Sequence, residues 1–233
     1  MCDREEVQEK SCEEKTEQTR QGILELGQVV TGTDGAIQTL VIAGQIEGHA
    51  ALPAGVKATR YEHVLPSLVA AEESEEIGGV LLLINTMGGD VESGLCMAEL
   101  IAGMKKPVAA LVLGGGHSIG IPLAVAAKRT FIAESATMTV HPVRINGLVL
   151  GVPQSFEYLR KMQERIMRFI IGHSRILPEK LEEWMQGRHD MATDIGTVVE
   201  AREAVSEGLV DEVGTLSSAI AWLKEEIKGQ KAQ

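Results

Sequence analysis

The chain has 233 residues and a formal net charge of −11, from 22 Lys and Arg against 33 Asp and Glu. No basic cluster interrupts this acidic balance, which argues against nucleic acid and anionic membrane surfaces as partners. Its three cysteines, Cys2, Cys12 and Cys96, lack a ligand-like spacing, and no apolar run approaches the ~20 residues that span a bilayer. The composition therefore predicts a cytoplasmic protein without membrane insertion.

The sequence predicts a polar N-terminal tail, one folded domain and a short C-terminal tail. Residues 1–27 are rich in Glu, Lys and Gln and lack apolar periodicity, which is typical of a solvated segment. We expect the folded domain over residues 28–225 and a fraying end over 226–233. Because 44% of the residues are hydrophobic but only 3% are aromatic, the core of this domain must be aliphatic.

Short aliphatic runs alternate with helical patterns through the first part of the domain. The runs are apolar almost throughout, which indicates a sheet covered on both faces and hence an α/β fold with parallel strands. Expected strands lie near residues 36–45, 78–85, 107–113, 129–133 and 137–141, and expected helices near 60–76, 90–104 and 119–128.

A longer amphipathic helix is expected over residues 153–176, after Pro142. Its apolar residues recur at helical spacing, and it exceeds the length of an ordinary globular helix. A long helix that projects from a compact domain usually packs against another chain, so we expect an oligomer. Shorter helices are expected over 178–186 and 198–208, followed by a strand within 209–214 and a C-terminal helix.

A glycine-rich turn, Gly116-His117-Ser118-Ile119-Gly120, joins an apolar strand to a helix. The pattern G-x-S-x-G in this context is typical of a nucleophile elbow, which exposes a serine hydroxyl at a sharp bend. In a chain with 25 glycines, a tight packing corner explains the same pattern. A phosphate-binding loop fits less well, because Ile119 stands where the dinucleotide motif requires glycine.

The order of the polar residues along the chain favours a Ser-His-Asp triad. A serine nucleophile needs a base and a group that orients this base. His141 ends an apolar run, and Asp190 and Asp194 follow later. The order of an ordinary α/β-hydrolase fits poorly, because no aspartate lies between Ser118 and His189. The candidate residues are therefore Ser118, His141 and either Asp190 or Asp194.

A second glycine-rich turn, residues 84–90 (INTMGGD), also lies between a strand and a helix. Adjacent glycines can turn backbone N–H groups toward an anion at a helix N-terminus. If Ser118 lies nearby, the N–H groups of Gly88 and Ile119 would form an oxyanion hole. A plain strand-to-helix turn is the alternative interpretation.

Three segments together resemble the proteolytic subunits of the Clp family of ATP-dependent serine proteases. They are LLLINTMGGDVESGLCMAELI, GGGHSIGIPLAVAAKRTFIAESATMTVHP and EAREAVSEGLVDEV, and the resemblance covers about residues 36–215. It implies a crotonase-like (ClpP-type) α/β spiral of ββα units, with the 153–176 helix as a protruding handle. It also implies a homo-oligomeric ring, a hexamer or heptamer that can stack, and a peptide or unfolded protein as substrate.

The sequence departs from this family at the base and at the N-terminus. Counted from Ser135, the family's histidine position holds Val140, and His141 is one residue further along. One residue on a strand turns a side chain to the opposite face, unless a bulge or the end of pairing before Pro142 restores its direction. The long hydrophilic N-terminal segment replaces a short apolar one, which argues against partnership with a Clp-type ATPase.

The sequence thus predicts a Clp-like serine endopeptidase without cofactor or metal. Ser118 is the expected nucleophile and His141 the expected base. Asp194 is the preferred acid because a small apolar segment follows it, and Asp190 is the alternative. The first rival is a catalytically silent Clp-like scaffold. The second is a crotonase-type enzyme that polarises an acyl-CoA thioester with the same two N–H groups.

Overall fold

The computed structural model describes residues 27–32, 35–145, 151–187 and 196–231. Its centre is a sheet with the strand order β1-β2-β4-β5-β6-β9, in which β3 pairs with β2, and β7 joins β5 to β8. The strands are β1 (Gln28–Thr31), β2 (Ala36–Glu47), β3 (Ala58–Arg60), β4 (Ile77–Gly89), β5 (Val108–Gly116), β6 (Arg129–Ile132), β7 (Thr137–Val140), β8 (Thr197–Glu200) and β9 (Glu212–Val213).

Parallel pairing joins β2, β4, β5, β6 and β9, as the nearly continuous apolar runs predicted. Helices α2 (Tyr61–Glu73), α3 (Val91–Gly103) and α4 (Gly120–Val125) connect successive strands of this parallel set. Because β4 and β5 are parallel neighbours, their carboxyl ends lie side by side. Both glycine-rich segments lie at these ends, where ligands commonly bind in open α/β sheets.

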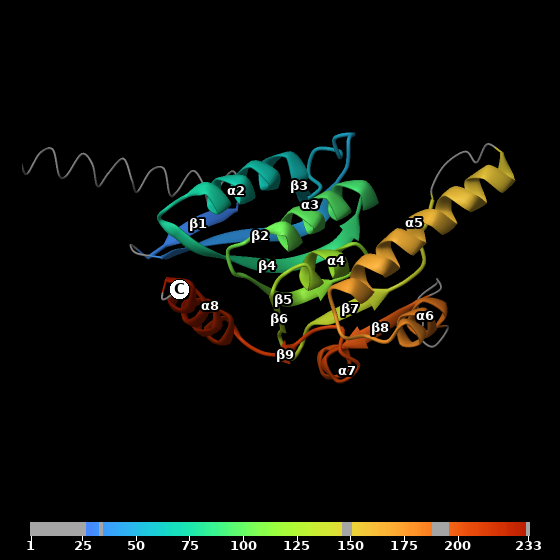
Figure 1. Cartoon of the computed structure of the whole chain (residues 1–233). Helices are drawn as coiled ribbons and strands as arrows, with labels where there is room; N and C mark the ends of the chain where they lie inside the picture. The colour runs from blue at the N-terminus through green and yellow to red at the C-terminus, as the bar shows by residue number, and fades with distance from the viewer. Residues whose placement is uncertain (1–26, 33–34, 146–150, 188–195, 232–233) are drawn as a thin grey trace, which may run out of the picture.

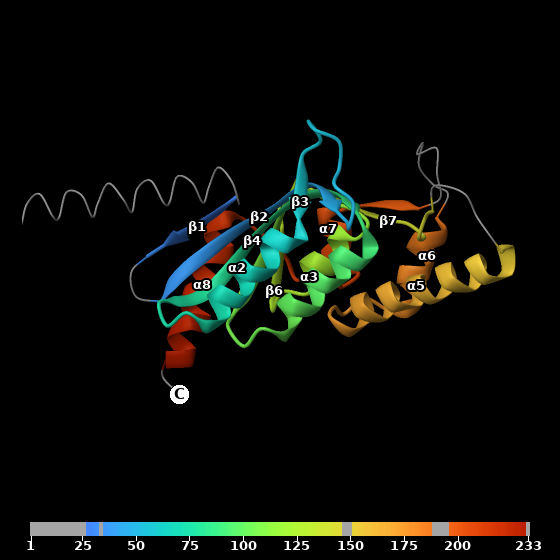
Figure 2. The ribbon, with the colours of Figure 1, turned by 90° about the horizontal axis from the view of Figure 1, so that it is seen from above.

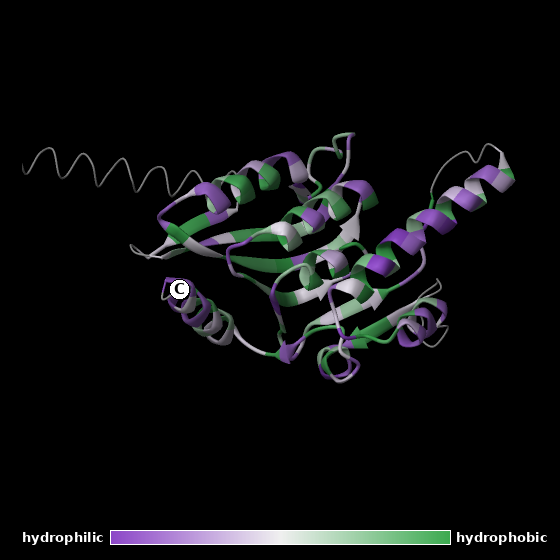
Figure 3. Ribbon diagram, viewed as in Figure 1, coloured by the Kyte–Doolittle hydropathy of each residue, from purple (hydrophilic) through white to green (hydrophobic). Residues whose placement is uncertain are grey.

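Helices cover both faces of the sheet. Figure 1 shows α2 and α3 on one side and α8 (Leu216–Lys231) on the other. The larger core lies under α2, α3, α4 and one end of α5 (Val152–Gly172), and a smaller core lies under α8. The central strands are largely green in Figure 3, in keeping with their burial.

Helix α5 packs on the body through its C-terminal half only. Its first turns extend beyond the other elements in both ribbon views (Figures 1 and 2). Val152 and Phe156, in the extending part, are 72% and 69% exposed. The helices α6 (Pro178–Gln186) and α7 (Ala201–Ser206) follow. The buried residues of α5 are Met162, Ile166, Phe169 and Ile170.

The five strands and the helices expected in the first part of the domain are all found, but two later predictions are wrong. The helix expected to reach residue 176 ends at Gly172, where the N–H of His173 donates to the carbonyls of Phe169 and Ile170. The helix expected from residue 198 begins at Ala201, because Thr197–Glu200 form β8 and pair antiparallel with β7.

The C-terminal segment is also more ordered than expected. Helix α8 continues to Lys231, past residue 226 where we expected fraying, and Ile227 is buried. Gly35 and Gly78 provide the space for its side chain, since a β-carbon on either would lie within 3 Å of Ile227 Cγ2. The polar tail expected over residues 1–27 lies outside the described residues except for Gly27.

Candidate active site

The structure brings Gly88, near the end of β4, directly against Ser118, in the turn after β5. The turn expected over residues 84–90 is instead strand as far as Gly89, which pairs with β2 after a shift of register between Gly44 and Gln45. The β4–β5 ladder shifts register after Ile84 and resumes with Thr86 opposite Gly116. Gly88 has a φ of 90°, and a β-carbon there would overlap the Ser118 side chain. Glycine is therefore required at position 88 both by its backbone and by its neighbour.

Ser118 lies at the sharpest point of its turn, with a φ of 56°. It is the one non-glycine residue with a positive φ in the described part of the chain. An L-residue in this region is strained by roughly 1–2 kcal/mol, and such strain is characteristic of functional sites. Hydrogen bonds hold the turn: His117 N–H donates to Thr86 O at 3.1 Å, and Ser118 N–H donates to Thr139 O at 2.9 Å. This strand-to-helix geometry is that of a nucleophile elbow.

His141 lines the same cavity as Ser118. Pairing between β7 and β8 ends at Val140, so His141 is released from the alternation of the strand. Val140, which stands at the family's histidine position, is only 1% exposed. The Nδ1 of His141 lies 2.7 Å from the carbonyl oxygen of Pro142. Since a carbonyl can only accept, Nδ1 carries the proton, and the lone pair of the neutral ring is on Nε2.

The cavity that contains Ser118 and His141 has a volume of about 200 Å³. Its walls are mostly aliphatic, and they come from α3, α4, α5 and α6 as well as from both sides of the serine turn. Among the described lining residues, Arg144 is the one with a permanently charged side chain. The other lining residues are Gly89, Val91, Ile119, Ile121, Val140, Pro142, Val143, Ile166, Ile170 and Met185.

The two N–H groups expected to form an oxyanion hole differ in their hydrogen bonding. The N–H groups of Ser118, Gly120 and Ile121 all donate to backbone carbonyls, whereas Ile119 N–H has no acceptor among the described residues. Gly88 N–H instead donates to the hydroxyl of Thr86 at 3.1 Å. That hydroxyl is buried and donates in turn to Gly44 O at 2.6 Å.

His117, directly before the serine, packs its ring against β7. Its Nδ1 lies 3.1 Å from the backbone N of Thr139 and 2.9 Å from the Thr139 hydroxyl. Burial, and secondarily the nearby His141, lower the pKa of His117 below its ordinary value of 6.5. No role for Thr86, Thr139 or His117 was predicted from the sequence. For His117, the signal was a histidine directly before the predicted nucleophile.

Both candidate acids, Asp190 and Asp194, lie outside the described residues, as does His189. The residues that flank this gap are nevertheless placed. Gly196 N–H donates to Gly187 O at 2.9 Å, which brings the two sides of the gap together. A β-carbon on Gly196 would lie 2.7 Å from His141 Cβ. Gly196 therefore lies directly beside the candidate base.

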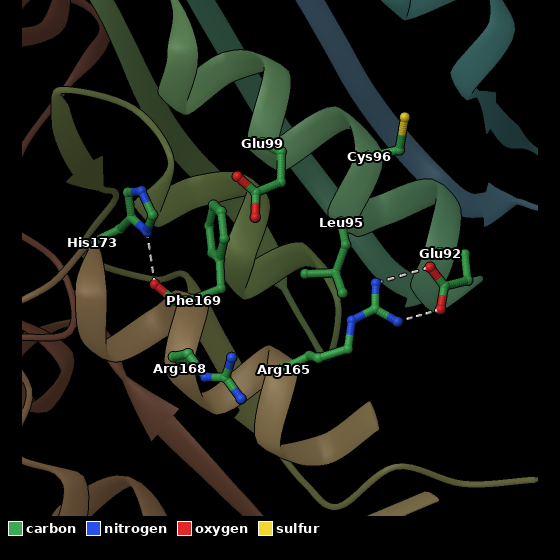
Figure 4. A pocket seen from close by; sticks show the side chains of 8 residues that line it. All are labelled: Glu92, Leu95, Cys96, Glu99, Arg165, Arg168, Phe169 and His173. Atoms are coloured by element: carbon green, nitrogen blue, oxygen red, sulfur yellow. Dashed lines mark hydrogen bonds and ion pairs between the residues drawn. The ribbon is translucent and has the colours of Figure 1, made fainter. Parts of the chain in front are cut away.

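A second, larger groove of about 480 Å³ lies between α3 and α5 (Figure 4). Arg165 forms a two-pronged ion pair with Glu92, with contacts of 2.6 and 3.0 Å, at one end of the groove. The His173 ring stacks on Phe169 at the other end, with 4.1 Å between centroids. This groove joins the start of α3 to the part of α5 that lines the serine cavity.

Two classes of feature are missing from the described residues. Within the ranges given above, no three His, Cys, Asp or Glu side chains gather in a way that could hold a metal ion. Likewise, none of the described helices combines the length and apolar character needed to cross a bilayer.

The structure thus places Ser118 at a strained strand-to-helix turn of a parallel α/β sheet, in a cavity that His141 also lines. The sequence model of the Clp protease family matches residues 38–217, and the chain belongs to this family. It is 55% identical over 195 residues to translocation-enhancing protein TepA of Halalkalibacterium halodurans, covering 84% of this chain and 76% of that protein.

Two further relatives are more distant. The chain is 28% identical over 142 residues to ATP-dependent Clp protease proteolytic subunit 1 of Protochlamydia amoebophila, covering 58% of this chain and 64% of that one. A mutant ClpP1 of Listeria monocytogenes has the same fold, with a TM-score of 0.61 and 22% identity, covering 78% of this chain and 94% of that chain. The expected ClpP-like fold is therefore confirmed.

Proposed function

We propose that the protein is a serine endopeptidase in which Ser118 is the nucleophile and His141 the general base. One observation carries the proposal: a strained, positive-φ serine at a strand-to-helix turn shares a cavity with a histidine whose Nδ1 proton is held by a carbonyl. This tautomer leaves the Nε2 lone pair available for a proton, which is the state that a general base requires.

The proposed reaction proceeds through an acyl-enzyme. His141 Nε2 accepts the Ser118 hydroxyl proton while the oxygen attacks the peptide carbonyl carbon. Collapse of the tetrahedral intermediate breaks the C–N bond, and His141 returns the proton to the leaving amine. A water molecule, deprotonated by His141, then hydrolyses the ester and regenerates the serine.

The tetrahedral oxyanion requires N–H donors beside Ser118. Ile119 N–H is suited to this role, because it has no acceptor among the described residues. Gly88 N–H becomes the second donor if it exchanges the Thr86 hydroxyl for the oxyanion. Since Thr86 also donates to Gly44 O, its hydroxyl keeps a partner after this exchange.

Asp194 is our preferred acid, and Asp190 the alternative. Gly196 lies against His141, and Asp194 is two residues before it in the chain. Two residues span at most about 7 Å, so the chain length permits a carboxylate to replace Pro142 O as the acceptor of the His141 Nδ1 proton. Asp190 is six residues from Gly196 and three from Gly187. Replacing each aspartate by asparagine in turn would identify the acid by the larger loss of activity.

The shape and chemistry of the cavity indicate a substrate with an aliphatic side chain next to the cleaved bond. A cavity of about 200 Å³ whose walls include Val, Ile and Met side chains accommodates an apolar residue. Peptides with leucine or methionine at this position should therefore be cleaved faster than peptides with aspartate or lysine.

We further propose that α5 is the handle of a homo-oligomeric ring. Apolar side chains at its extending end and just before it are exposed in the single chain, which is typical of a surface that another copy covers. Size-exclusion chromatography with light scattering would give the ring size. These exposed residues are Val152 (72%), Phe156 (69%), Tyr158 (55%) and Ile145 (50%).

Active-site labelling tests the proposal. A fluorophosphonate should label the unsubstituted protein, and both Ser118→Ala and His141→Ala should abolish labelling and peptide cleavage while the oligomer stays intact. Ser206→Ala, which changes an exposed serine on α7, is the matched control and should label normally. Labelling of Ser118→Ala at the normal rate would reject Ser118 as nucleophile.

A catalytically silent scaffold is the second candidate, favoured by the hydrogen bond between Gly88 N–H and the Thr86 hydroxyl. In this alternative the bond is permanent and the oxyanion hole never forms. The scaffold predicts no labelling of the unsubstituted protein but an intact oligomer.

A further inference from the structure

The imidazole of His117 is held in a single tautomer by strand β7. Its Nδ1 faces the backbone N–H of Thr139 at 3.1 Å, and a backbone N–H can only donate. Nδ1 must therefore present its lone pair, and the ring proton is on Nε2. The Thr139 hydroxyl, 2.9 Å from the same nitrogen, then also donates to it. The lone pair of His117 is thus fully occupied, and this histidine cannot accept the Ser118 proton.

Both backbone polar groups of Thr139 form hydrogen bonds with the serine turn. Its N–H donates to the His117 ring, and its carbonyl accepts the N–H of Ser118 at 2.9 Å. In a regular sheet, the N–H and the carbonyl of Thr139 would both bond to the backbone of the neighbouring strand. Here the N–H donates to a side chain instead. Because His141 is two residues after Thr139, these bonds connect the candidate nucleophile with the candidate base.

The position of the ring depends on the glycine beneath it. A β-carbon on Gly115 would lie 2.3 Å from Nε2 of His117 and 2.6 Å from its Cδ2. Gly115 is also the residue of β5 that pairs with Thr137 of β7. The ring therefore fills the space between two strands at the point where they meet, and its orientation is determined by packing as well as by hydrogen bonds.

We propose that His117 is a positioning residue, whose neutral imidazole couples the Ser118 turn to β7 and thereby sets the spacing between Ser118 and His141. This inference rests on the proposed peptidase function. Protonation would make Nδ1 a donor that faces the two donors of Thr139, so both hydrogen bonds would be lost. Activity should therefore decline at acid pH through His117. Among the described residues, His141 is the ionisable neighbour that contributes to the lowered pKa of this ring.

Two substitutions separate this role from a merely structural one. His117→Ala removes the acceptor, and labelling of Ser118 should slow by about tenfold to a hundredfold, since a displacement near 1 Å has effects of this size. His117→Asn supplies an amide oxygen near the position of Nδ1 that does not titrate. It should restore most of the rate and shift the acid limb of the pH profile to lower pH.

The outcomes are distinguishable from failure of the proposed function. Equal labelling rates for the unsubstituted protein and His117→Ala would overturn the inference, and so would an Asn variant as slow as the Ala variant. If the unsubstituted protein is not labelled, the peptidase proposal fails. Long-range ¹H–¹⁵N spectra of the full-length protein then test the His117 geometry, because a proton on Nδ1 at neutral pH would contradict it.

Discussion

Gly88 and Ser118 approach each other so closely that a β-carbon on Gly88 would lie 2.6 Å from Ser118 Cβ and 3.2 Å from its hydroxyl oxygen. The two turns that would supply the oxyanion hole and the nucleophile are therefore in direct contact. Any side chain on Gly88 must displace one of them.

We expect Gly88→Ala to slow labelling of Ser118 by about a hundredfold, because a shift near 1 Å at the reacting atoms has this effect. The positive φ should also lower the free energy of unfolding by about 1–2 kcal/mol. Labelling kinetics and urea denaturation measure the two effects. Gly229→Ala in α8, with open space around it, is the control: it should leave labelling unchanged and should not lower the free energy of unfolding, because alanine favours a helix over glycine. Normal labelling of Gly88→Ala would contradict the contact.

The strain at Ser118 predicts that catalysis and stability conflict at this position. Glycine adopts a φ of 56° without steric cost, whereas alanine retains the strain. Ser118→Gly should therefore have a free energy of unfolding about 1 kcal/mol higher than Ser118→Ala, while both variants lack labelling. Thermal denaturation compares the two. Equal stability would show that the backbone at position 118 relaxes in the variants.

The lowered pKa of His117 predicts a loss of stability in acid. The unfolded histidine titrates near 6.5 and the folded one at lower pH, so the unfolded chain binds more protons between these values. The His117 contribution to the free energy of unfolding is fully present above pH 6.5. It decreases as the pH falls through 6.5 toward the folded pKa. Urea denaturation of His117→Asn should show less pH dependence over this window than the unsubstituted protein.

The ion pair between Glu92 and Arg165 should affect the substrate more than stability. Both side chains are nearly half exposed, 45% and 49%, so their coupling should be below about 1 kcal/mol in a double-mutant cycle. Arg165 precedes Ile166, which lines the serine cavity. Glu92→Gln and Arg165→Gln should each raise KM more than they lower kcat.

The pH dependence of this pair provides a second measurement. The hydrogen bond from Arg165 lowers the pKa of Glu92 below 4.5, so the coupling should be present above pH 4.5 and disappear as the pH falls through the lowered pKa. The pair Glu134–Arg202, which is more exposed, is the control. An equally large effect on KM from Glu134→Gln would show that the Glu92 result is not specific to the cavity.

The parallel sheet and the approach of the two glycine turns could be predicted from the sequence. Both follow from short-range signals: continuous aliphatic runs indicate buried parallel strands, and parallel neighbours place their carboxyl ends together. Ser118 and Gly88 were identified in this way, because each lies directly after such a run. The resemblance to Clp proteolytic subunits added the order of the segments and the role of the long helix as a handle.

The remaining features depend on contacts between distant residues. Thr86 binds Gly88 N–H because its hydroxyl is fixed by Gly44 O, on another strand. Residues 198–200 were assigned to a helix together with the segment that forms α7. They form β8 because β7 offers an unpaired edge. The release of His141 from the strand depended on where this pairing ends, for which Pro142 was the local signal.

The antiparallel ladder of β7 with β8 also determines when the site can form during synthesis. Strand β7 pairs with β5 at a single position, Thr137 with Gly115, but with β8 along its whole length. Strand β8 lies near the carboxyl end of the chain, long after the segment that carries Ser118. A nascent chain that ends before Thr197 therefore contains Ser118 but lacks the strand with which β7 pairs along its whole length. Under the proposed peptidase function, the site is therefore completed only after β8 has been synthesised.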